Sequence, residues 1–154
     1  MLENKKVIII GDKDGIPGPA IEDCLKKTDV DVVFQITACF TCSLAGAMDI
    51  KNQQKIKDLA FEHGKENLIV ILGGGDVETC TITAETISAG DITEVGPLTG
   101  IKLGIPVYHI FEQEIRKECN ESVYEERCAI MEMVLDVDNI INSLESVRTK
   151  FAKY

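Results

Sequence analysis

Two cysteines three positions apart are the residues of this chain whose types and spacing most directly suggest chemistry. Cys39 and Cys42 stand in the stretch ACFTCSLAGAMDI, which covers residues 38–50. A Cys-x-x-Cys pair can hold a zinc ion, cycle between dithiol and disulfide, or supply one nucleophile together with a helper thiol. The rest of the sequence has to discriminate between these three kinds of site.

A zinc site has little support in the rest of the sequence. Structural zinc sites of the ribbon type use two ligand pairs, and this chain has no second Cys-x-x-Cys. We expect His109 to be a buried, hydrogen-bonded residue near the end of a strand, and we expect no metal ligand at His63 or His109. Two unreactive cysteines, with Cys39 in the core and Cys42 exposed, are the structural alternative to a reactive pair.

Composition and charge limit the partners of the protein. The formal net charge of −10 argues against binding to nucleic acid through its phosphates. No apolar stretch approaches the roughly 20 residues of a membrane span, and the start MLENKKVIIIGD lacks the cleavage site of a signal peptide. We therefore expect a cytoplasmic protein that binds neither nucleic acid nor membrane, with mostly reduced cysteines. Four of the six cysteines stand singly in the sequence: Cys24, Cys80, Cys119 and Cys128.

The elements that must position the pair alternate between buried strands and amphipathic helices. Continuous apolar runs predict strands at 5–11, 30–36, 67–72 and 105–110. Helical spacing of apolar residues predicts helices around 20–25, 56–63, 77–87, 122–134 and 138–151. We therefore expect a single α/β domain over residues 1–154, a three-layer sandwich with a mostly parallel four-stranded sheet in the flavodoxin-like order 2-1-3-4.

Sheets of this kind place their sites at the carboxyl ends of the strands, near the switch point between strands 1 and 3. The loop 37–49 lies at that edge and contains the cysteine pair. The loop 11–19, GDKDGIPGP, lies there too, but it matches neither the dinucleotide nor the P-loop pattern. Asp12 and Asp14 would also repel an anion, so we expect this loop to be a structural turn.

The position of the pair also bears on its reactivity. Backbone N–H groups at the start of a helix stabilise a thiolate and lower the pKa of a thiol from its usual value of about 8.5. Cys42 is nearer to the following helix than Cys39. The residues by themselves therefore favour a redox dithiol in which Cys42 is the more reactive member.

Five stretches of the chain carry a resemblance to a known family: KKVIIIGDKDGIPGPAIEDCL, CFTCSLAGAMDIKNQ, TAETISAGD, GPLTGIKLGIPVYHIFE and MEMVLDVDNII. They span nearly the whole sequence and resemble the small selenoprotein component A of the glycine, sarcosine and betaine reductase complexes of anaerobic bacteria. The family motif is Cys-x-x-selenocysteine. The selenocysteine position falls on Cys42 and its partner on Cys39, so this sequence departs from the family by carrying cysteine at position 42.

The resemblance implies a reaction sequence and a set of partners. Residue 42 would attack the α-carbon of glycine, sarcosine or betaine activated on component B, expel the amine and carry a carboxymethyl group. Component C would take the two-carbon unit on to acetyl phosphate. Residues 39 and 42 would be left bridged, and a thioredoxin system would reduce them. The resemblance implies no cofactor on this chain.

Two other functions stay open from the residues alone. The first is a stand-alone dithiol oxidoreductase of thioredoxin type, which would use Cys39 and Cys42 without a carboxymethyl intermediate. The second is a non-enzymatic flavodoxin-like or nucleotide-binding module, for which a yellow colour or a co-purifying nucleotide would be the sign.

Overall fold

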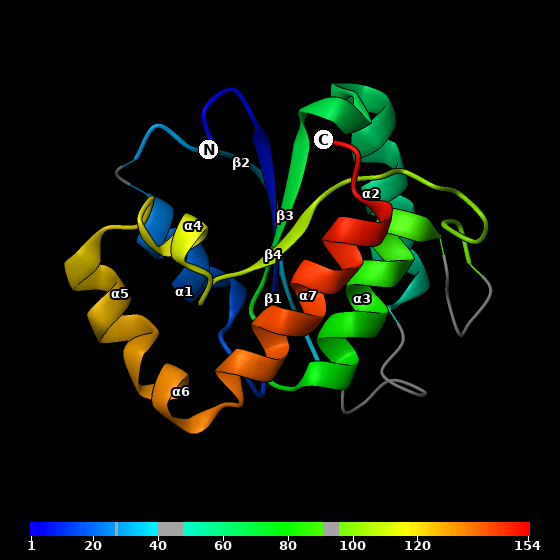
Figure 1. The fold of residues 1–154 in the computed structure, drawn as a ribbon. Coiled ribbons are helices and arrows are strands. Elements are labelled where there is room, and N and C mark those ends of the chain that lie inside the picture. Colours follow the sequence, from blue (N-terminus) through cyan, green and yellow to red (C-terminus); the bar gives the residue numbers. More distant parts are fainter. Residues whose placement is uncertain (27, 40–47, 91–95) are drawn as a thin grey trace.

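The computed structural model of the chain describes residues 1–26, 28–39, 48–90 and 96–154, and in this part the strands form one parallel sheet. Its order is β2-β1-β3-β4 (Figure 1), which confirms the predicted α/β class and strand order. The strands are β1 (Lys6–Asp12), β2 (Asp31–Ala38), β3 (Leu68–Leu72) and β4 (Val107–His109).

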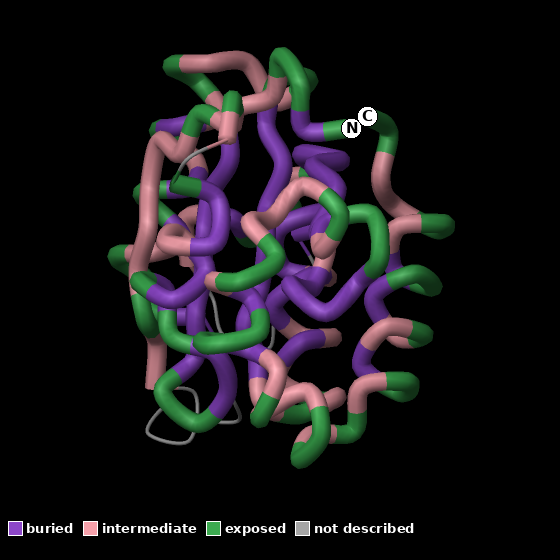
Figure 2. Tube along the Cα trace, turned by 90° about the vertical axis from the view of Figure 1, so that its left-hand side faces the viewer, coloured by how far each residue is buried: buried purple, intermediate pink, exposed green. Residues whose placement is uncertain are grey.

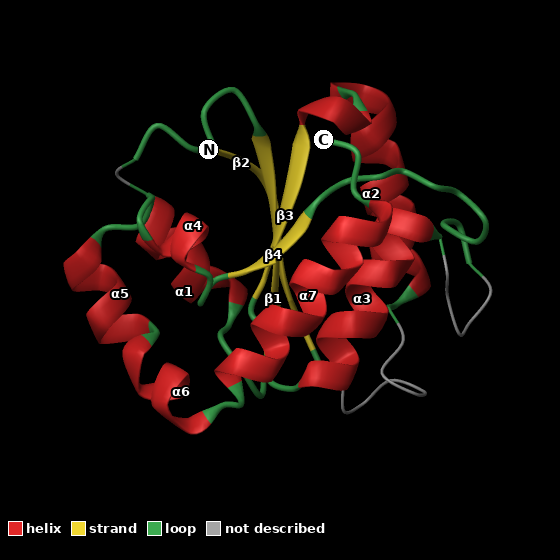
Figure 3. Ribbon diagram, in the orientation of Figure 1, coloured by secondary structure: helices red, strands yellow, loops and turns green. Residues whose placement is uncertain are grey.

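Helices cover both faces of the sheet, as the three-layer prediction requires (Figure 3). One face carries α2 (Ile50–His63), α3 (Val77–Ala89) and α7 (Val137–Phe151), with the short 3-10 helix η3 (Lys65–Asn67) between α2 and β3. The other face carries α1 (Gly18–Leu25), α4 (Gln113–Arg116), α5 (Glu121–Arg127) and α6 (Ala129–Val134).

The alternation of side chains along a strand divides the interior into two cores. In β1, Ile8 and Ile10 pack toward α2, α3 and α7, whereas Val7 and Ile9 pack toward α1 and α5. Every residue of β3 is buried, because this strand lies inside the sheet and is covered on both faces. Figure 2 shows the buried residues running through the middle of the molecule, with exposed residues on its outer turns.

Both ends of α3 have typical capping residues, whereas the helix predicted over 122–134 differs in the structure. Asp76 caps α3 by accepting a hydrogen bond from Thr79 N–H at 2.9 Å, and Gly90 ends that helix in the left-handed conformation. The helix predicted over 122–134 is instead the two helices α5 and α6, because the backbone of Cys128 departs from helical geometry with φ −120°. The side chain of Asn120 caps α5 by accepting from Val123 N–H.

The strand predicted over 105–110 is shorter in the structure, where β4 covers only three residues. Pro106 has no N–H to donate, and only its carbonyl pairs with the sheet, accepting from Val70 N–H at 3.0 Å. The short helix α4 after this strand was not predicted, since four residues are too few to show a periodic pattern.

A buried ion pair attaches α7 to the end of β4. The guanidinium of Arg148 donates to both carboxylate oxygens of Glu112, at 2.8 and 2.7 Å, and to Val107 O at 2.9 Å. It also lies over the ring of Tyr108, 3.9 Å from the ring centroid. Glu112 is 2% exposed, so the C-terminal helix is tied to the sheet by a charge pair that water scarcely reaches.

His109 is buried and hydrogen-bonded, as the sequence predicts. Its Nδ1 accepts from Phe111 N–H at 3.2 Å, so Nε2 carries the hydrogen of the neutral ring and donates to Gly74 O at 2.9 Å. Burial lowers the pKa of His109 to about 4, against an ordinary value of 6.5. The imidazole is therefore a neutral link between the ends of β4 and β3.

Removing the charge of Glu112 should be costly. Glu112→Gln should lower the free energy of unfolding by roughly 3 kcal/mol, because it leaves the largely buried charge of Arg148 without its counter-ion. The same acid-to-amide change at Asp31, an exposed partner of Lys6, should cost under about 1 kcal/mol. Urea unfolding of both variants measures the difference. Equal losses would show that burial of the first pair has no bearing on its contribution.

Acidification should remove the part of the free energy of unfolding that comes from keeping His109 neutral in the folded protein. The unfolded chain binds a proton at the ordinary pKa of 6.5, whereas the folded protein keeps the ring neutral down to a pKa of about 4. This stabilisation is therefore complete above pH 6.5 and disappears as the pH falls to 4. By linkage it amounts to on the order of 3 kcal/mol.

Urea unfolding at a series of pH values tests this component. His109→Gln has no titrating ring, so its free energy of unfolding should fall less than that of the wild type between neutral pH and pH 4. His63→Gln, which removes the other histidine and keeps His109, is the matched control. Parallel curves for the wild type and His109→Gln would contradict the prediction.

Candidate functional site

The carboxyl ends of the strands meet at one edge of the sheet, at the lower side of Figure 1, and the chain leaves this edge in two directions. After β1 it enters α1 on one face, and after β3 it enters α3 on the opposite face. Because β1 and β3 are neighbours, the switch point predicted from the sequence lies between them.

A buried carboxylate joins the loops that follow these two strands. Asp12 is 2% exposed. Its Oδ1 accepts from Asp14 N–H at 3.1 Å and its Oδ2 from Gly75 N–H at 2.9 Å. Hydrogen bonds to an ionised carboxylate are roughly twice as strong as those between neutral groups. This anchoring role was not predicted, although an acidic residue at the end of an apolar strand was the signal for it.

Glycines let the same two loops approach at backbone distance. Ile16 N–H donates to Gly73 O at 2.8 Å. A Cβ on Gly15 would lie 2.1 Å from that same oxygen, and a Cβ on Gly73 would lie 2.1 Å from Ile16 O. No side chain fits at either place. The glycines at these positions are therefore explained by backbone packing.

The loop after β1 keeps no backbone donor for a phosphate. The N–H groups of residues 12–16 all donate within the protein, to Ile16 O, Ala38 O, the Asp12 side chain, Asp12 O and Gly73 O in chain order. At the start of α1, Gly18 N–H donates to Thr37 Oγ1 at 2.8 Å. Because phosphate loops depend on open N–H groups at a helix start, these bonds support the prediction of a structural turn.

The first cysteine of the pair lies at the same edge. Lys13 N–H donates to Ala38 O at 2.9 Å, and Cys39 follows Ala38 directly, half-buried. The predicted position of Cys39 after the second strand is therefore confirmed. Cys42 lies outside the described residues, so its relation to Cys39 and the roles of both stay predictions.

The helix that follows the pair is already capped. α2 begins at Ile50, eight positions after Cys42 in the sequence. The carboxylate of Asp49 accepts from Lys51 N–H at 2.6 Å and from Asn52 N–H at 3.3 Å. Two of the N–H groups expected to stabilise a thiolate are thus bonded to a charged side chain instead.

Cys80 in α3 lies against this edge but is a poor nucleophile. A Cβ on Gly74 would lie 2.3 Å from Cys80 Sγ, so the sulfur packs directly on the loop after β3. Burial, with the charges of Asp76 and Asp12 adding to it, raises the pKa of Cys80 to about 12. Its thiol therefore stays protonated at neutral pH, and a protonated thiol is a weak nucleophile.

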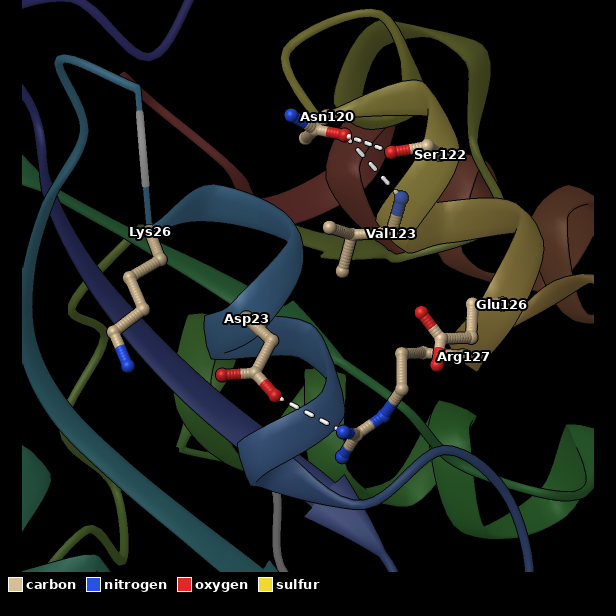
Figure 4. A pocket seen from close by; sticks show the side chains of 7 residues that line it. All are labelled: Asp23, Lys26, Asn120, Ser122, Val123, Glu126 and Arg127. Atoms are coloured by element: carbon tan, nitrogen blue, oxygen red, sulfur yellow. Dashed lines mark hydrogen bonds and ion pairs between the residues drawn. The ribbon is translucent and has the colours of Figure 1, made fainter.

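The described residues, 1–26, 28–39, 48–90 and 96–154, contain neither a metal cluster nor a membrane-spanning helix. In these residues no group of three or more His, Cys, Asp and Glu side chains is arranged to hold a metal ion. None of their helices combines the length and apolar character needed to cross a bilayer. A hollow of about 290 Å³ between α1 and α5 contains none of the predicted site residues (Figure 4); its lining is Asp23, Lys26, Asn120, Ser122, Val123, Glu126 and Arg127.

Known proteins similar to this chain cover its full length. A protein of Clostridium botulinum called glycine/sarcosine/betaine reductase complex component A is 52% identical over 154 residues, which is 100% of this chain and 98% of the relative. Component A of Gottschalkia purinilytica is 51% identical over 148 residues, 96% of this chain and 99% of that one. Component A1 of Peptoclostridium acidaminophilum is 49% identical over 154 residues, again 100% and 98%.

No solved structure matches the chain, so the family rests on the sequence comparisons. The family model described as glycine reductase complex selenoprotein A matches residues 2–148. This match and the relatives cover the same stretches that carry the resemblance seen in the sequence, including the Cys-x-x-Cys segment. The chain belongs to the family of glycine reductase complex selenoprotein A.

Proposed function

We propose that this chain is the carrier component of a glycine, sarcosine or betaine reductase complex, with Cys42 as the attacking residue and Cys39 as the resolving residue. The observation that carries the proposal is the family match along the whole chain, with the cysteine pair at the family's motif. The position of Cys39 at the carboxyl edge of the sheet supports it, since open α/β sheets place their sites there.

The proposed cycle balances as a two-electron reduction. The thiolate of Cys42 attacks the α-carbon of the amino acid held by component B, and the amine leaves with its electron pair. The product is a carboxymethyl thioether on Cys42. Cys39 then attacks Cys42 Sγ, the C–S bond breaks, and the two-carbon unit leaves with the bonding electron pair and takes up a proton. On component C, inorganic phosphate replaces a carboxylate oxygen, which leaves as water, and the product is acetyl phosphate. A cytoplasmic thioredoxin system returns the Cys39–Cys42 disulfide to the dithiol.

The described part of the site supports the resolving role of Cys39. Cys39 follows a strand whose last carbonyl is bonded to Lys13 N–H. A resolving thiol must lie at bonding distance from its partner, so a fixed backbone at Cys39 favours this role. Sulfur at position 42 should react more slowly than the selenium of the family motif, because a selenol is more acidic and its anion is the better nucleophile.

Serine substitutions should separate the two roles. Cys42→Ser should accept no carboxymethyl group, since a hydroxyl without an adjacent base is a far weaker nucleophile than a thiolate. Cys39→Ser should still accept the group but release it poorly, lowering repeated turnover at least about tenfold. The assay supplies labelled glycine with components B and C and scores protein-bound label and acetyl phosphate separately.

The same assay discriminates the carrier from a simple dithiol oxidoreductase. Mass spectrometry of the wild-type chain after turnover should find a carboxymethyl adduct on residue 42. Equal labelling of the two serine variants would defeat the role assignment. If only a disulfide forms and no adduct is found in a chain that supports turnover, the oxidoreductase function replaces the proposed one. A selenocysteine-containing chain serves as the reference for full activity.

Replacing Asp12 should slow release of the carboxymethyl group while the sheet stays folded. Asp12→Asn places an amide NH2 against a backbone N–H that now donates to a carboxylate, a mismatch that costs about 1–3 kcal/mol. We expect the variant to stay folded and to lose turnover several-fold, with initial carboxymethyl labelling less affected. Asp29→Asn, on an exposed turn before β2, is the matched control and should behave as the wild type. Unchanged turnover in Asp12→Asn would show that the anchor does not position Cys39.

A further inference from the structure

Three thiols that the proposed cycle does not use gather in the core on the α1 side of the sheet. Cys24 lies in α1, Cys119 follows α4, and Cys128 separates α5 from α6. The Sγ atoms of Cys24 and Cys128 lie 3.8 Å apart, although 104 positions separate these residues in the sequence. All three are free thiols, and Cys24 and Cys128 have no exposed surface.

We propose that Cys24 and Cys128 form a second dithiol–disulfide pair, which is oxidised by low-molecular-weight disulfides through Cys119. Closing the bond requires the two sulfurs to move about 1.8 Å nearer, from the observed 3.8 Å to the roughly 2.0 Å of a disulfide. The three sulfurs are not arranged as a metal site, because no described group of three or more such side chains could hold an ion. Bond formation between sulfurs is thus the chemistry that their geometry favours.

The backbone around the pair is held on both sides. Asp23 and Arg127, each the residue before one of the two cysteines, form an ion pair at 3.1 Å. Figure 4 shows this pair bridging α1 and α5. Asn120 N–H donates to Cys24 O at 2.9 Å and so fixes the end of α1 to the start of α5. Cys24 and Cys128 are therefore held in register before any covalent bond forms.

The cluster also favours an attacking thiolate. Hydrogen bonds from Cys119 and Cys128 lower the pKa of Cys24, with the charge of Arg127 adding to the effect. The contacts with Cys24 and burial raise the pKa of Cys119 and of Cys128, so these two thiols keep their protons. The Cys119 thiol also donates to Ile115 O at 3.4 Å. The thiolate is the form that attacks a disulfide, so the lowered pKa of Cys24 favours exchange within the cluster.

Access to the cluster runs through Cys119. This residue is half-buried and lines a hollow of about 260 Å³ together with Gln113, Arg116, Lys117, Glu121 and Tyr124. A small disulfide that enters this hollow meets Cys119, whereas Cys24 and Cys128 are closed to solvent. The half-buried thiol of Cys119 therefore has to react before the buried pair.

The reaction balances as three exchanges. The thiolate of Cys119, formed by passing its proton to Cys24, attacks the small disulfide RSSR and releases one RS⁻. The released RS⁻ takes the proton of Cys24, which then attacks Cys119 Sγ, and the second RS⁻ leaves. Cys128 passes its proton to this second RS⁻, attacks Cys24 Sγ and frees Cys119 as a thiolate. In total, two protein thiols give up two electrons and two protons, and one RSSR becomes two RSH.

Oxidised glutathione, used as the probe on the full chain, tests the proposal. The background is Cys39→Ser/Cys42→Ser, which removes the motif pair from the reaction. After acid quenching, free thiols are alkylated in denaturant and peptides are mapped by mass spectrometry. We expect a Cys24–Cys128 disulfide that dithiothreitol reverses, with Cys80 alkylated throughout. Adding Cys119→Ser should slow its formation at least tenfold, and adding Cys80→Ser should leave the rate unchanged.

Three results would overturn the proposal. Complete alkylation of Cys24 and Cys128 after incubation would show that the pair does not oxidise. A stable Cys24–Cys119 disulfide would show that the terminal pair is wrong. An unchanged rate in Cys119→Ser would show that the buried pair is reached by another route. The main readout keeps the cluster intact, and circular dichroism checks that the serine background is folded.

Discussion

One buried carboxylate constrains the edge of the sheet where the cysteine pair begins. A charge removed from water is tolerated only when hydrogen bonds replace its hydration, and both oxygens of Asp12 obtain theirs from backbone N–H groups of two different loops. Those loops must therefore keep their positions for the buried side chain of Asp12 to keep its hydrogen bonds. The loop after β1 also holds the last carbonyl of β2, and the loop after β3 is bonded to His109 of β4. The Asp12 side chain and these two contacts together link the ends of the described strands.

This constraint fits the function proposed for the chain. The backbone donors of the loop after β1 are spent on carbonyls and on Asp12, so that loop serves as a frame for the cysteine motif. A frame suits a carrier whose substrate is bound by another component, because the carrier has to position a reactive atom and does not have to recognise an amino acid. The half-buried position of Cys39 directly after β2 agrees with a residue that acts inside such a frame.

The environments of the other cysteines show why residue type alone does not decide reactivity. Cys80 and Cys24 are both buried and both lie on a helix that packs on the sheet. The sulfur of Cys80 lies near two carboxylates, which raise its pKa further than burial does alone. Cys24 is surrounded by two thiol donors and the charge of Arg127, which lower its pKa. The same side chain is inert on one face of the sheet and poised for exchange on the other.

The sequence by itself determined the order of elements, the parallel sheet and the placement of Cys39, because buried strands and amphipathic helices leave strong local patterns along the chain. It also identified the family from stretches around positions such as Gly11 and Cys42. It did not reveal the Asp12 anchor, the Glu112–Arg148 pair or the contact of Cys24 with Cys128. Each joins residues that lie 36 to 104 positions apart. Such contacts leave no periodic pattern in the sequence. The packing of the elements in the folded protein decides which distant side chains meet.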